Sequence, residues 1–279
     1  IQMLDGNRIR SIIRDSQNRL WISTWRGAGL VCYDGEKAVV YTPADGLISE
    51  QLRSVCETGN GSMAVVVTGG VNIIEDGKVT ASYGEKDGIS KETLCVASAP
   101  NGDVLVGTNG GGIYAIGDGG IRRISKDDGL KSDIVMRIKY DSERKLFWIV
   151  ASNSIAYMTE DYKVTTVTKF PYSNNFDMFE NSKGDMWVLS SNGIYVVPTE
   201  DLIANETIRP VYYSMANGLR CIATANSYSE LTDEGNLYIA GNTGVSSVNI
   251  EEPLELIDDL KQAVPFIVGD GIFYYPDKD

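Results

Sequence analysis

The feature that most constrains the fold is a short motif that returns six times along the 279-residue chain. Each copy is an apolar run that ends in a small polar residue and is followed by a glycine or asparagine turn. The spacing of the copies, from 39 residues (148 to 187) to 51 residues (187 to 238), indicates a repeat of about forty residues with one insertion, which we place around 199–207. The second residues of the six copies are Trp21, Val65, Leu105, Trp148, Trp187 and Tyr238.

Within one repeat the pattern predicts four short strands. In the first copy they are expected at residues 9–14, 20–24, 30–33 and 39–41, and Asp34-Gly35 is a hairpin signal between the last two. A second marker runs in phase with the first and precedes each new strand-like run. Its copies are Asp45-Gly46-Leu47, Asp87-Gly88-Ile89, Asp128-Gly129-Leu130 and Asn217-Gly218-Leu219.

Four strands in about forty residues are the size of a β-propeller blade. The sequence therefore predicts an all-β protein, a β-propeller with six visible repeats and six or seven blades. Two β-sandwiches are the alternative, but a sandwich has no reason to repeat one motif six times. We expect the propeller over residues 1–255, and a linker with the first segment of a following β-sandwich over 256–279. The large residue at the second motif position is expected to fill the wedge between blades.

Composition excludes several classes of function. The formal net charge is −13, which argues against nucleic acid and anionic membrane surfaces as partners. There is no histidine, so catalytic triads that need one cannot be built. We expect no metal and no cofactor. The cysteines are scattered, without a C-x-x-C pair, and are expected to be small buried residues with no predicted disulfide state; they are Cys32, Cys56, Cys95 and Cys221.

No segment approaches 18 uncharged apolar residues, and no signal peptide pattern opens the chain. The chain begins with Ile1 rather than Met and closes on Tyr274-Tyr275-Pro276-Asp277-Lys278-Asp279, so both ends look cut. We therefore expect a soluble fragment of a longer protein. An incomplete ring of blades would leave open sheet edges, which favour pairing with another copy as a homodimer.

A binding site is expected at one mouth of the central channel. The loop after the second strand should lie on the same face as the Asp-Gly-Leu loop, because the first two strands run in opposite directions. Trp25 and Arg26 interrupt a turn where other repeats have glycine, and an aromatic ring beside an arginine suits a sugar or a carboxylate. The asparagines of this set are also common in turns for purely local reasons. The candidate ligand-binding residues are Trp25, Arg26, Arg53, Asn109, Arg137, Asn153, Phe176, Asn192 and Asn242.

The repeat resembles a known family. The segments at residues 18–24 and 102–108, each after an Asp-Gly marker and before a glycine-rich turn, are similar to the two-component regulator propeller repeat. The resemblance covers roughly residues 5 to 252, and 264–277 resembles the start of the sandwich that follows such propellers. It implies an extracytoplasmic sensor domain, on the periplasmic or cell-surface side of a membrane-anchored bacterial signalling protein, with an external ligand that is often an oligosaccharide. Two departures are Val65 in place of the Trp and Ala151 in place of the Thr.

We expect a non-catalytic, ligand-sensing propeller. The alternative is an interaction scaffold that binds a partner protein and no small molecule. An enzyme would need paired carboxylates across a cleft or a metal, and the expected mouth is rich in Asn, Gly and Ser instead. A concave pocket with convergent polar groups would favour the sensor, and a flat apolar patch the scaffold.

Overall fold

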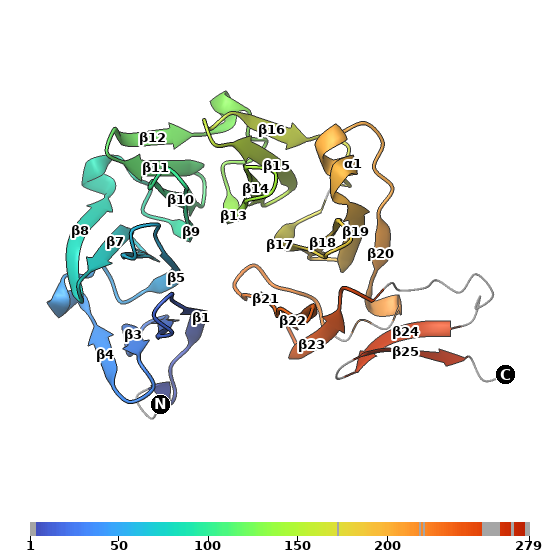
Figure 1. Cartoon of the computed structure of the whole chain (residues 1–279), viewed down its shortest axis with the longest axis horizontal. Helices are drawn as coiled ribbons and strands as arrows, with labels where there is room; N and C mark the ends of the chain where they lie inside the picture. Colours follow the sequence, from blue (N-terminus) through green and yellow to red (C-terminus); the bar gives the residue numbers. More distant parts are fainter. Residues whose placement is uncertain are drawn as a thin grey trace. The chain divides into compact units, whose positions relative to one another are not determined.

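The computed structural model describes residues 4–171, 173–217, 219, 221–252, 263–268 and 271–276, the last two ranges as backbone strands. The chain is a β-propeller built from antiparallel sheets, and it divides into two compact units, residues 1–166 and 167–279 (Figure 1).

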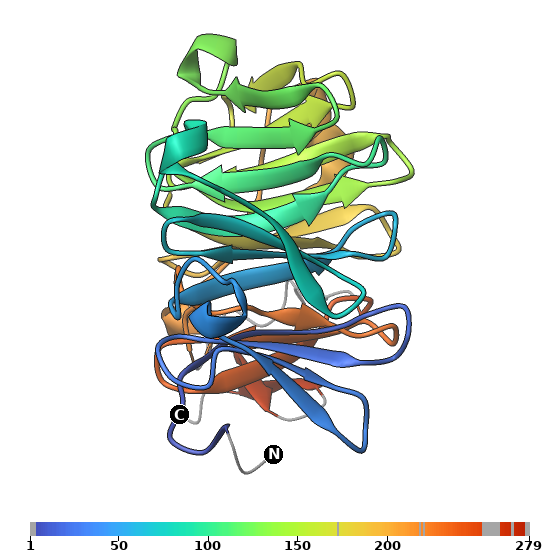
Figure 2. The ribbon, with the colours of Figure 1, turned by 90° about the vertical axis from the view of Figure 1, so that its left-hand side faces the viewer.

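The first unit consists of four four-stranded blades. In each, consecutive strands are neighbours, and the first strand lies on the inner side of the unit (Figure 1). Figure 2 shows the strands of this unit running between two sides that carry the loops. The blades are β1 (Ile9–Arg14), β2 (Leu20–Thr24), β3 (Leu30–Tyr33) and β4 (Ala38–Tyr41); β5 (Leu52–Glu57), β6 (Met63–Val67), β7 (Gly70–Glu75) and β8 (Lys78–Gly84); β9 (Thr93–Ser98), β10 (Val104–Thr108), β11 (Ile113–Gly117) and β12 (Gly120–Ile124); β13 (Val135–Asp141), β14 (Leu146–Ala151), β15 (Ser154–Thr159) and β16 (Val164–Val167).

The second unit contains the fifth and sixth repeats. The fifth is a four-stranded blade, and the sixth has three strands among the described residues. A separate antiparallel hairpin follows, and the prediction that a β-sandwich begins there stays a prediction. The elements are β17 (Asn175–Glu180), β18 (Asp185–Ser190), β19 (Ile194–Pro198), α1 (Thr199–Ala204) and β20 (Val211–Tyr213); β21 (Glu230–Leu231), β22 (Asn236–Ala240) and β23 (Val245–Asn249); β24 (Ala263–Val268) and β25 (Gly271–Pro276).

The strands predicted for the first repeat are confirmed, with β4 starting one residue earlier than expected. The insertion predicted around 199–207 is also present, as helix α1 between β19 and β20. One part of the repeat alignment was wrong. Trp21 pairs with Ile13, and the residue in the same register of the second blade is Ala64, which pairs with Cys56, so Val65 does not replace the Trp. The misalignment arose because Thr68 was aligned with Thr24 as the polar end of the run, whereas in the structure Val67 holds the place of Thr24 and Thr68 that of Trp25.

The Asp-Gly-Leu marker has a local physical cause. Its Asp is the last residue of a single 3-10 turn, such as η2 (Pro43–Asp45), in which the Asp45 carboxylate accepts the backbone N–H of Thr42 at 2.9 Å. Gly46 then takes φ 105°, a left-handed conformation that favours glycine. Leu47 turns inward and is 4 % exposed. Asp87 and Asp128 make the same hydrogen bond in η3 (Glu85–Asp87) and η4 (Lys126–Asp128).

The tryptophans at the second motif position are buried as predicted, whereas the prediction was wrong for Tyr238; the tryptophans are Trp21, Trp148 and Trp187. Trp21 is 2 % exposed and packs into one apolar cluster with Val55 and Val65 of the second blade. Trp187 packs in the same way with Leu237 of the sixth repeat. These contacts bury the wedge between successive blades. Tyr238 differs from the other members of this set, because it is 42 % exposed.

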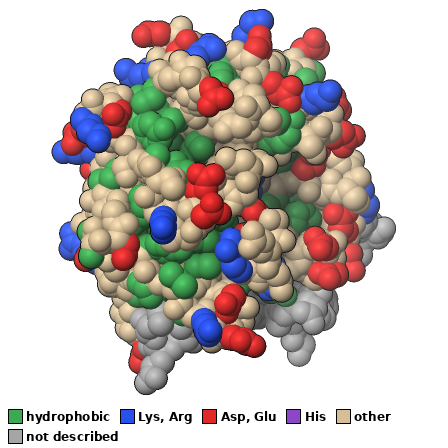
Figure 3. Space-filling model, turned by 60° about the vertical axis from the view of Figure 1, so that its left-hand side comes forward, with side chains coloured by type: hydrophobic (Ala, Val, Ile, Leu, Met, Phe, Trp, Pro, Cys, Tyr) green, Lys and Arg blue, Asp and Glu red, His purple; other side chains and the backbone are tan. Residues whose placement is uncertain are grey.

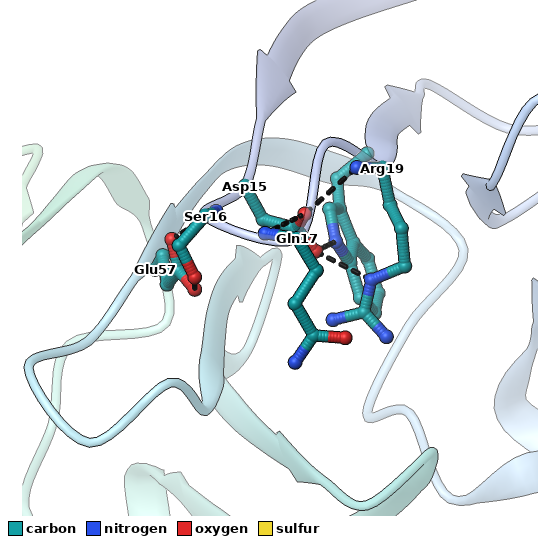
Figure 4. A network of polar contacts seen from close by, with 6 residues as sticks. Asp15, Ser16, Gln17, Arg19 and Glu57 are labelled. Carbon is teal, nitrogen blue, oxygen red and sulfur yellow. Dashed lines mark hydrogen bonds and ion pairs between the residues drawn. The ribbon is translucent and has the colours of Figure 1, made fainter.

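A buried carboxylate, that of Asp15, fixes the first of these tryptophans, and Figure 4 shows it with Gln17 and Arg19. Asp15, whose side chain is fully buried, accepts Trp21 Nε1 at 2.7 Å and Arg19 Nε at 2.6 Å, as well as the backbone N–H of Gln17 and Arg19. Burial would raise the pKa of Asp15, but the hydrogen bonds from Trp21 and Arg19 outweigh it, so this pKa is lowered. Next to it, Ser16 donates to Glu57 of the second blade (Figure 4).

The four cysteines are free thiols in this structure. Cys32, Cys95 and Cys221 are buried, and Cys56 is half-buried. Burial raises the pKa of the Cys56 thiol to about 12, with a further contribution from Cys95. A thiol with such a pKa is protonated at neutral pH and unreactive.

Candidate functional site

The loops after the second strands are tied to the segments that lead into the first strands. The first loop residue donates its N–H to the carbonyl just before the inner strand of its own blade, and the next loop residue donates to the segment before the following blade. In the first unit these two loop sets therefore lie on the same side, as the strand directions predicted. The bonds are Trp25 to Arg8 (2.8 Å), Thr68 to Gln51 (2.9 Å), Asn109 to Glu92 (2.7 Å), Arg26 to Glu50 (3.0 Å), Gly69 to Lys91 (2.7 Å) and Gly110 to Asp133 (2.9 Å).

On this side, Trp25 lies between arginines from two blades. The guanidinium carbon of Arg10, from β1, is 4.6 Å from the centroid of the Trp25 ring. That of Arg53, from β5, is also 4.6 Å away. Both distances fall within the range of cation–π attraction. All three side chains are half-buried. We call this group the Arg10–Trp25–Arg53 stack.

A β-bulge at the same place in each inner strand positions the two arginines. Ile9 pairs with Thr24 and Ser11 with Ser23, so Arg10 is the extra residue in β1. In β5, Leu52 pairs with Val67 and Ser54 with Val66, which makes Arg53 the extra residue. A bulge re-aims the side chain of the extra residue. The extra residues of β9, β13 and β17 are Leu94, Met136 and Phe176.

Arg26 is held beside the stack in a strained conformation. Its φ is 56°, whereas the equivalent Gly69 and Gly110 have φ 105° and 99°. A left-handed conformation disfavours residues other than glycine, and such strain gathers at functional sites. In the amide orientation that satisfies its neighbours, Gln51 accepts Arg26 Nε at 3.0 Å and Nη2 at 3.1 Å, and donates to Thr68 Oγ1.

Three other predicted site residues of the first unit lie outside the stack. Asn109 is exposed in the loop that corresponds to Trp25. Asn153 is half-buried, and its Oδ1 has no hydrogen-bond partner among the described residues. Arg137 is 5 % exposed and donates to the carbonyl of Met136. It is not the counterpart of Arg53, because Met136 holds the bulge position of the fourth blade.

The second unit contains the remaining three predicted site residues. Phe176 packs against the apolar cluster of that unit, which includes Trp187 and Leu237. Asn192 is exposed, and its carbonyl accepts the Tyr212 hydroxyl at 2.7 Å. Asn242 is exposed, but its side-chain oxygen accepts the N–H of Ile222 at 3.2 Å. Phe176 and Asn242 therefore have structural roles.

The sequence reasoning missed two features. Arg10 was not identified, although its position between an aliphatic residue and a serine matches that of Arg53 between Leu52 and Ser54. In the sixth repeat, Ala223 pairs with Gly241 and Glu230 with Tyr238, so the segment 224–229 lies opposite only Ile239 and Ala240. This enlarged bulge occupies the place that Arg10 has in β1, and the spacing alone could not separate it from the insertion at helix α1.

A cleft of about 370 Å³ lies elsewhere in the first unit, between the outer strands β4 and β8. Val40, Tyr41, Val79, Asp45 and Lys78 contribute to its lining, and none of them belongs to the predicted site. Figure 3 brings this side of the unit forward and shows apolar side chains interspersed with charged ones. A mixed lining without a cluster of convergent polar groups offers no specific chemistry, so the stack remains the candidate site.

Sequence comparison confirms the resemblance inferred from the repeats. A family model described as a two component regulator propeller matches residues 3–26, which include β1, β2 and Trp25. The match lies within the first repeat and does not extend to the later ones. Comparison with curated protein sequences gives no match.

Solved structures share the fold. The extracellular domain of a protein described as a hybrid two-component system from B. thetaiotaomicron matches with TM-score 0.75 and 17 % identity, over 93 % of this chain and 36 % of that one. A second extracellular domain from the same organism, described as part of a one-component system, matches with TM-score 0.65 and 16 % identity, over 94 % of this chain and 40 % of that one.

An enzyme also shares the fold. Virginiamycin B lyase from Staphylococcus aureus matches with TM-score 0.66 and 17 % identity, over 98 % of this chain and 94 % of that one. Identities this low establish the fold alone. The chain spans 36 % and 40 % of the two extracellular domains, so it is comparable in length to a part of them. No helix among the described residues is long and apolar enough to cross a membrane.

Proposed function

We propose that the chain is a ligand-sensing propeller in the extracytoplasmic part of a bacterial membrane-anchored signalling protein, and that its ligand binds at the loop-bearing side around the Arg10–Trp25–Arg53 stack. The observation that carries this proposal is the convergence of Trp25, Arg10 and Arg53 from two blades on one point. Convergent polar and aromatic groups on a rigid scaffold are typical of small-molecule sites. The two-component regulator repeat and the extracellular neighbours support the sensory role.

A non-catalytic role is part of the proposal. One solved structure of the lyase is described as a catalytically inactive variant in which a histidine is replaced by alanine. This chain contains no histidine, so that residue has no equivalent here. The described residues also hold no cluster of side chains suited to a metal ion. The absence of histidine therefore supports binding without turnover.

The test is a thermal-shift screen of the purified chain against oligosaccharides, organic acids and peptides. A ligand at about a hundred times its Kd stabilises the fold by roughly 2.7 kcal/mol, which shifts Tm by several degrees. We expect a hit that Trp25→Leu abolishes. Val39→Ala is the control, because Val39 is exposed on the outer strand β4 and its loss should leave the shift intact.

Two results would count against the proposal. A hit that survives Trp25→Leu and disappears with a change in the outer cleft would place the site elsewhere. No shift with any compound would favour the alternative function, a scaffold that binds a partner protein.

A further inference from the structure

The stack changes which chemical groups the site presents. The sequence suggested that the Trp25 ring would stack on a sugar. In the structure, the guanidinium carbons of Arg10 and Arg53 each lie 4.6 Å from the ring centroid, so arginine already contacts the π-system of the indole. A sugar ring that stacks on Trp25 would have to share the ring with these guanidinium groups. Arg10 and Arg53 have further partners within the protein, and with five N–H donors each they can contact a ligand in addition.

Positive charge is concentrated around this ring in a chain whose net charge is −13. Arg10 and Arg53 flank it, and Arg26 follows it in the sequence. Arg8 accepts the Trp25 N–H through its carbonyl and is itself exposed. Arginine stays protonated at any physiological pH and has five N–H donors, so it can bind an anion in addition to its contacts within the protein.

The positions of the two central arginines are fixed by the backbone. Both are bulge residues, and Trp25 between them is held by the bond from its N–H to Arg8 and by a β-bridge to Gln51. Contact with the ring orients each planar guanidinium group. Pre-oriented guanidinium groups match the geometry of a carboxylate, which they bind through two parallel N–H bonds. In this arrangement Trp25 is a positioning residue.

We infer that the Arg10–Trp25–Arg53 stack binds a carboxylate group of the ligand. This rests on the proposed function, because it specifies the chemistry of the same site. A small molecule with one or a few carboxylates fits the charge distribution better than a polyanion, since the negative net charge of the chain repels a long anionic polymer beyond the local cluster. The carboxylate belongs either to an acidic sugar or to a free organic acid.

The experiment compares two sugars that differ only in this group, D-galacturonate and D-galactose, with citrate as a non-sugar carboxylate. Binding to the purified chain is followed by Tm and by calorimetric titration at constant ionic strength. We expect galacturonate to raise Tm and galactose to have no effect. Equal binding of citrate would show that the site recognises the carboxylate alone, whereas binding of galacturonate only would show that the sugar ring contributes; either result supports the inference.

Variants test the residues. Arg10→Gln and Arg53→Gln should each weaken galacturonate binding roughly tenfold or more, the order expected when a charge-assisted hydrogen-bonded pair is lost. Arg53→Lys keeps the charge without the planar group and should lie between wild type and Arg53→Gln. Arg122→Gln is the matched control, because Arg122 lies 5.5 Å from the Tyr162 ring in another part of the unit and its loss should not change binding. The circular dichroism spectrum of each variant shows whether it is folded.

Three results would overturn the inference. They are equal binding of galacturonate and galactose, no binding of either galacturonate or citrate to the wild-type chain, and equal affinities of the wild type and folded Arg53→Gln for the carboxylate that binds. Failure of the carboxylate inference can be distinguished from failure of the sensor proposal. If a neutral compound of the broader screen shifts Tm through Trp25, the sensor stands and the carboxylate inference falls; if nothing in either experiment binds, both fall.

Discussion

Replacing Asp15 by alanine should destabilise the first blade by removing the acceptor that holds Trp21. The carboxylate accepts four hydrogen bonds, from Gln17, twice from Arg19, and from Trp21 Nε1. The two turn amides are near solvent and can bind water, and Arg19, with 31 % of its side chain exposed, loses an ion pair of small value.

The largest loss comes from Trp21. It is 2 % exposed, so its indole N–H would remain buried without an acceptor, at a cost of about 1–3 kcal/mol. With a smaller contribution from the turn, the expected destabilisation by Asp15→Ala is about 3 kcal/mol. For a chain of this size that corresponds to a fall in Tm of about 6 to 9 °C.

The assay is thermal and urea unfolding followed by tryptophan fluorescence and by circular dichroism. Asp34→Ala is the matched control, since Asp34 is an exposed turn residue that accepts only the backbone N–H of Glu36 and Lys37. We expect it to cost less than about 1 kcal/mol, as surface substitutions do. If Asp15→Ala and Asp34→Ala destabilise equally, the buried carboxylate does not hold the tryptophan, and the reasoning is refuted.

Three further predictions follow from the same geometry. Asp15 and Asp141 have folded-state pKa values below their ordinary value, so their stabilisation is present at neutral pH and is lost as pH falls through about 4 and below; Asp15→Ala should therefore flatten the dependence of unfolding free energy on pH between about 5 and 2, and an unchanged slope would contradict it. Gly107→Ala should cost about 1–3 kcal/mol in urea unfolding, because its Cβ would lie 2.5 Å from Cys95 Sγ, whereas Gly119→Ala, with open space around it, should cost less than 1 kcal/mol. Arg26→Gly should change Tm by less than about 3 °C, since relief of left-handed strain, about 1 kcal/mol, offsets the lost bonds to Gln51; a large fall would show that those bonds dominate.

Most of the local structure could be read from the sequence because it depends on short-range rules. The four strands of the first repeat and the Asp34-Gly35 turn follow from apolar runs separated by residues that adopt positive φ. The Asp-Gly-Leu marker is a complete local device, in which Asp45 caps the turn and Gly46 ends it. The wedge-filling role of Trp21 also followed, since a large apolar residue recurring at one position must be buried by the neighbouring repeat.

The candidate site was only partly predictable because it depends on register. Arg137 was chosen by analogy with Arg53, but a shift of one residue places Met136 at the bulge and buries Arg137. Arg10 was overlooked although its neighbours match those of Arg53, because only the pairing register shows that both are the extra residues of their strands. Phe176 does hold the bulge position, yet it packs against the apolar cluster of its own unit.

The sequence by itself determined the all-β repeat architecture, the strand boundaries of the first repeat and the end of the strands at which the loops gather, because each follows from interactions between residues close together in the chain. Only the tertiary structure brought Arg53 of the second blade to the Trp25 ring, which Arg10 of the first blade also contacts. That contact depends on how one blade packs against the next and on where each inner strand bulges. These are properties of the packed sheets, and a one-residue change in register moves a side chain to the other face.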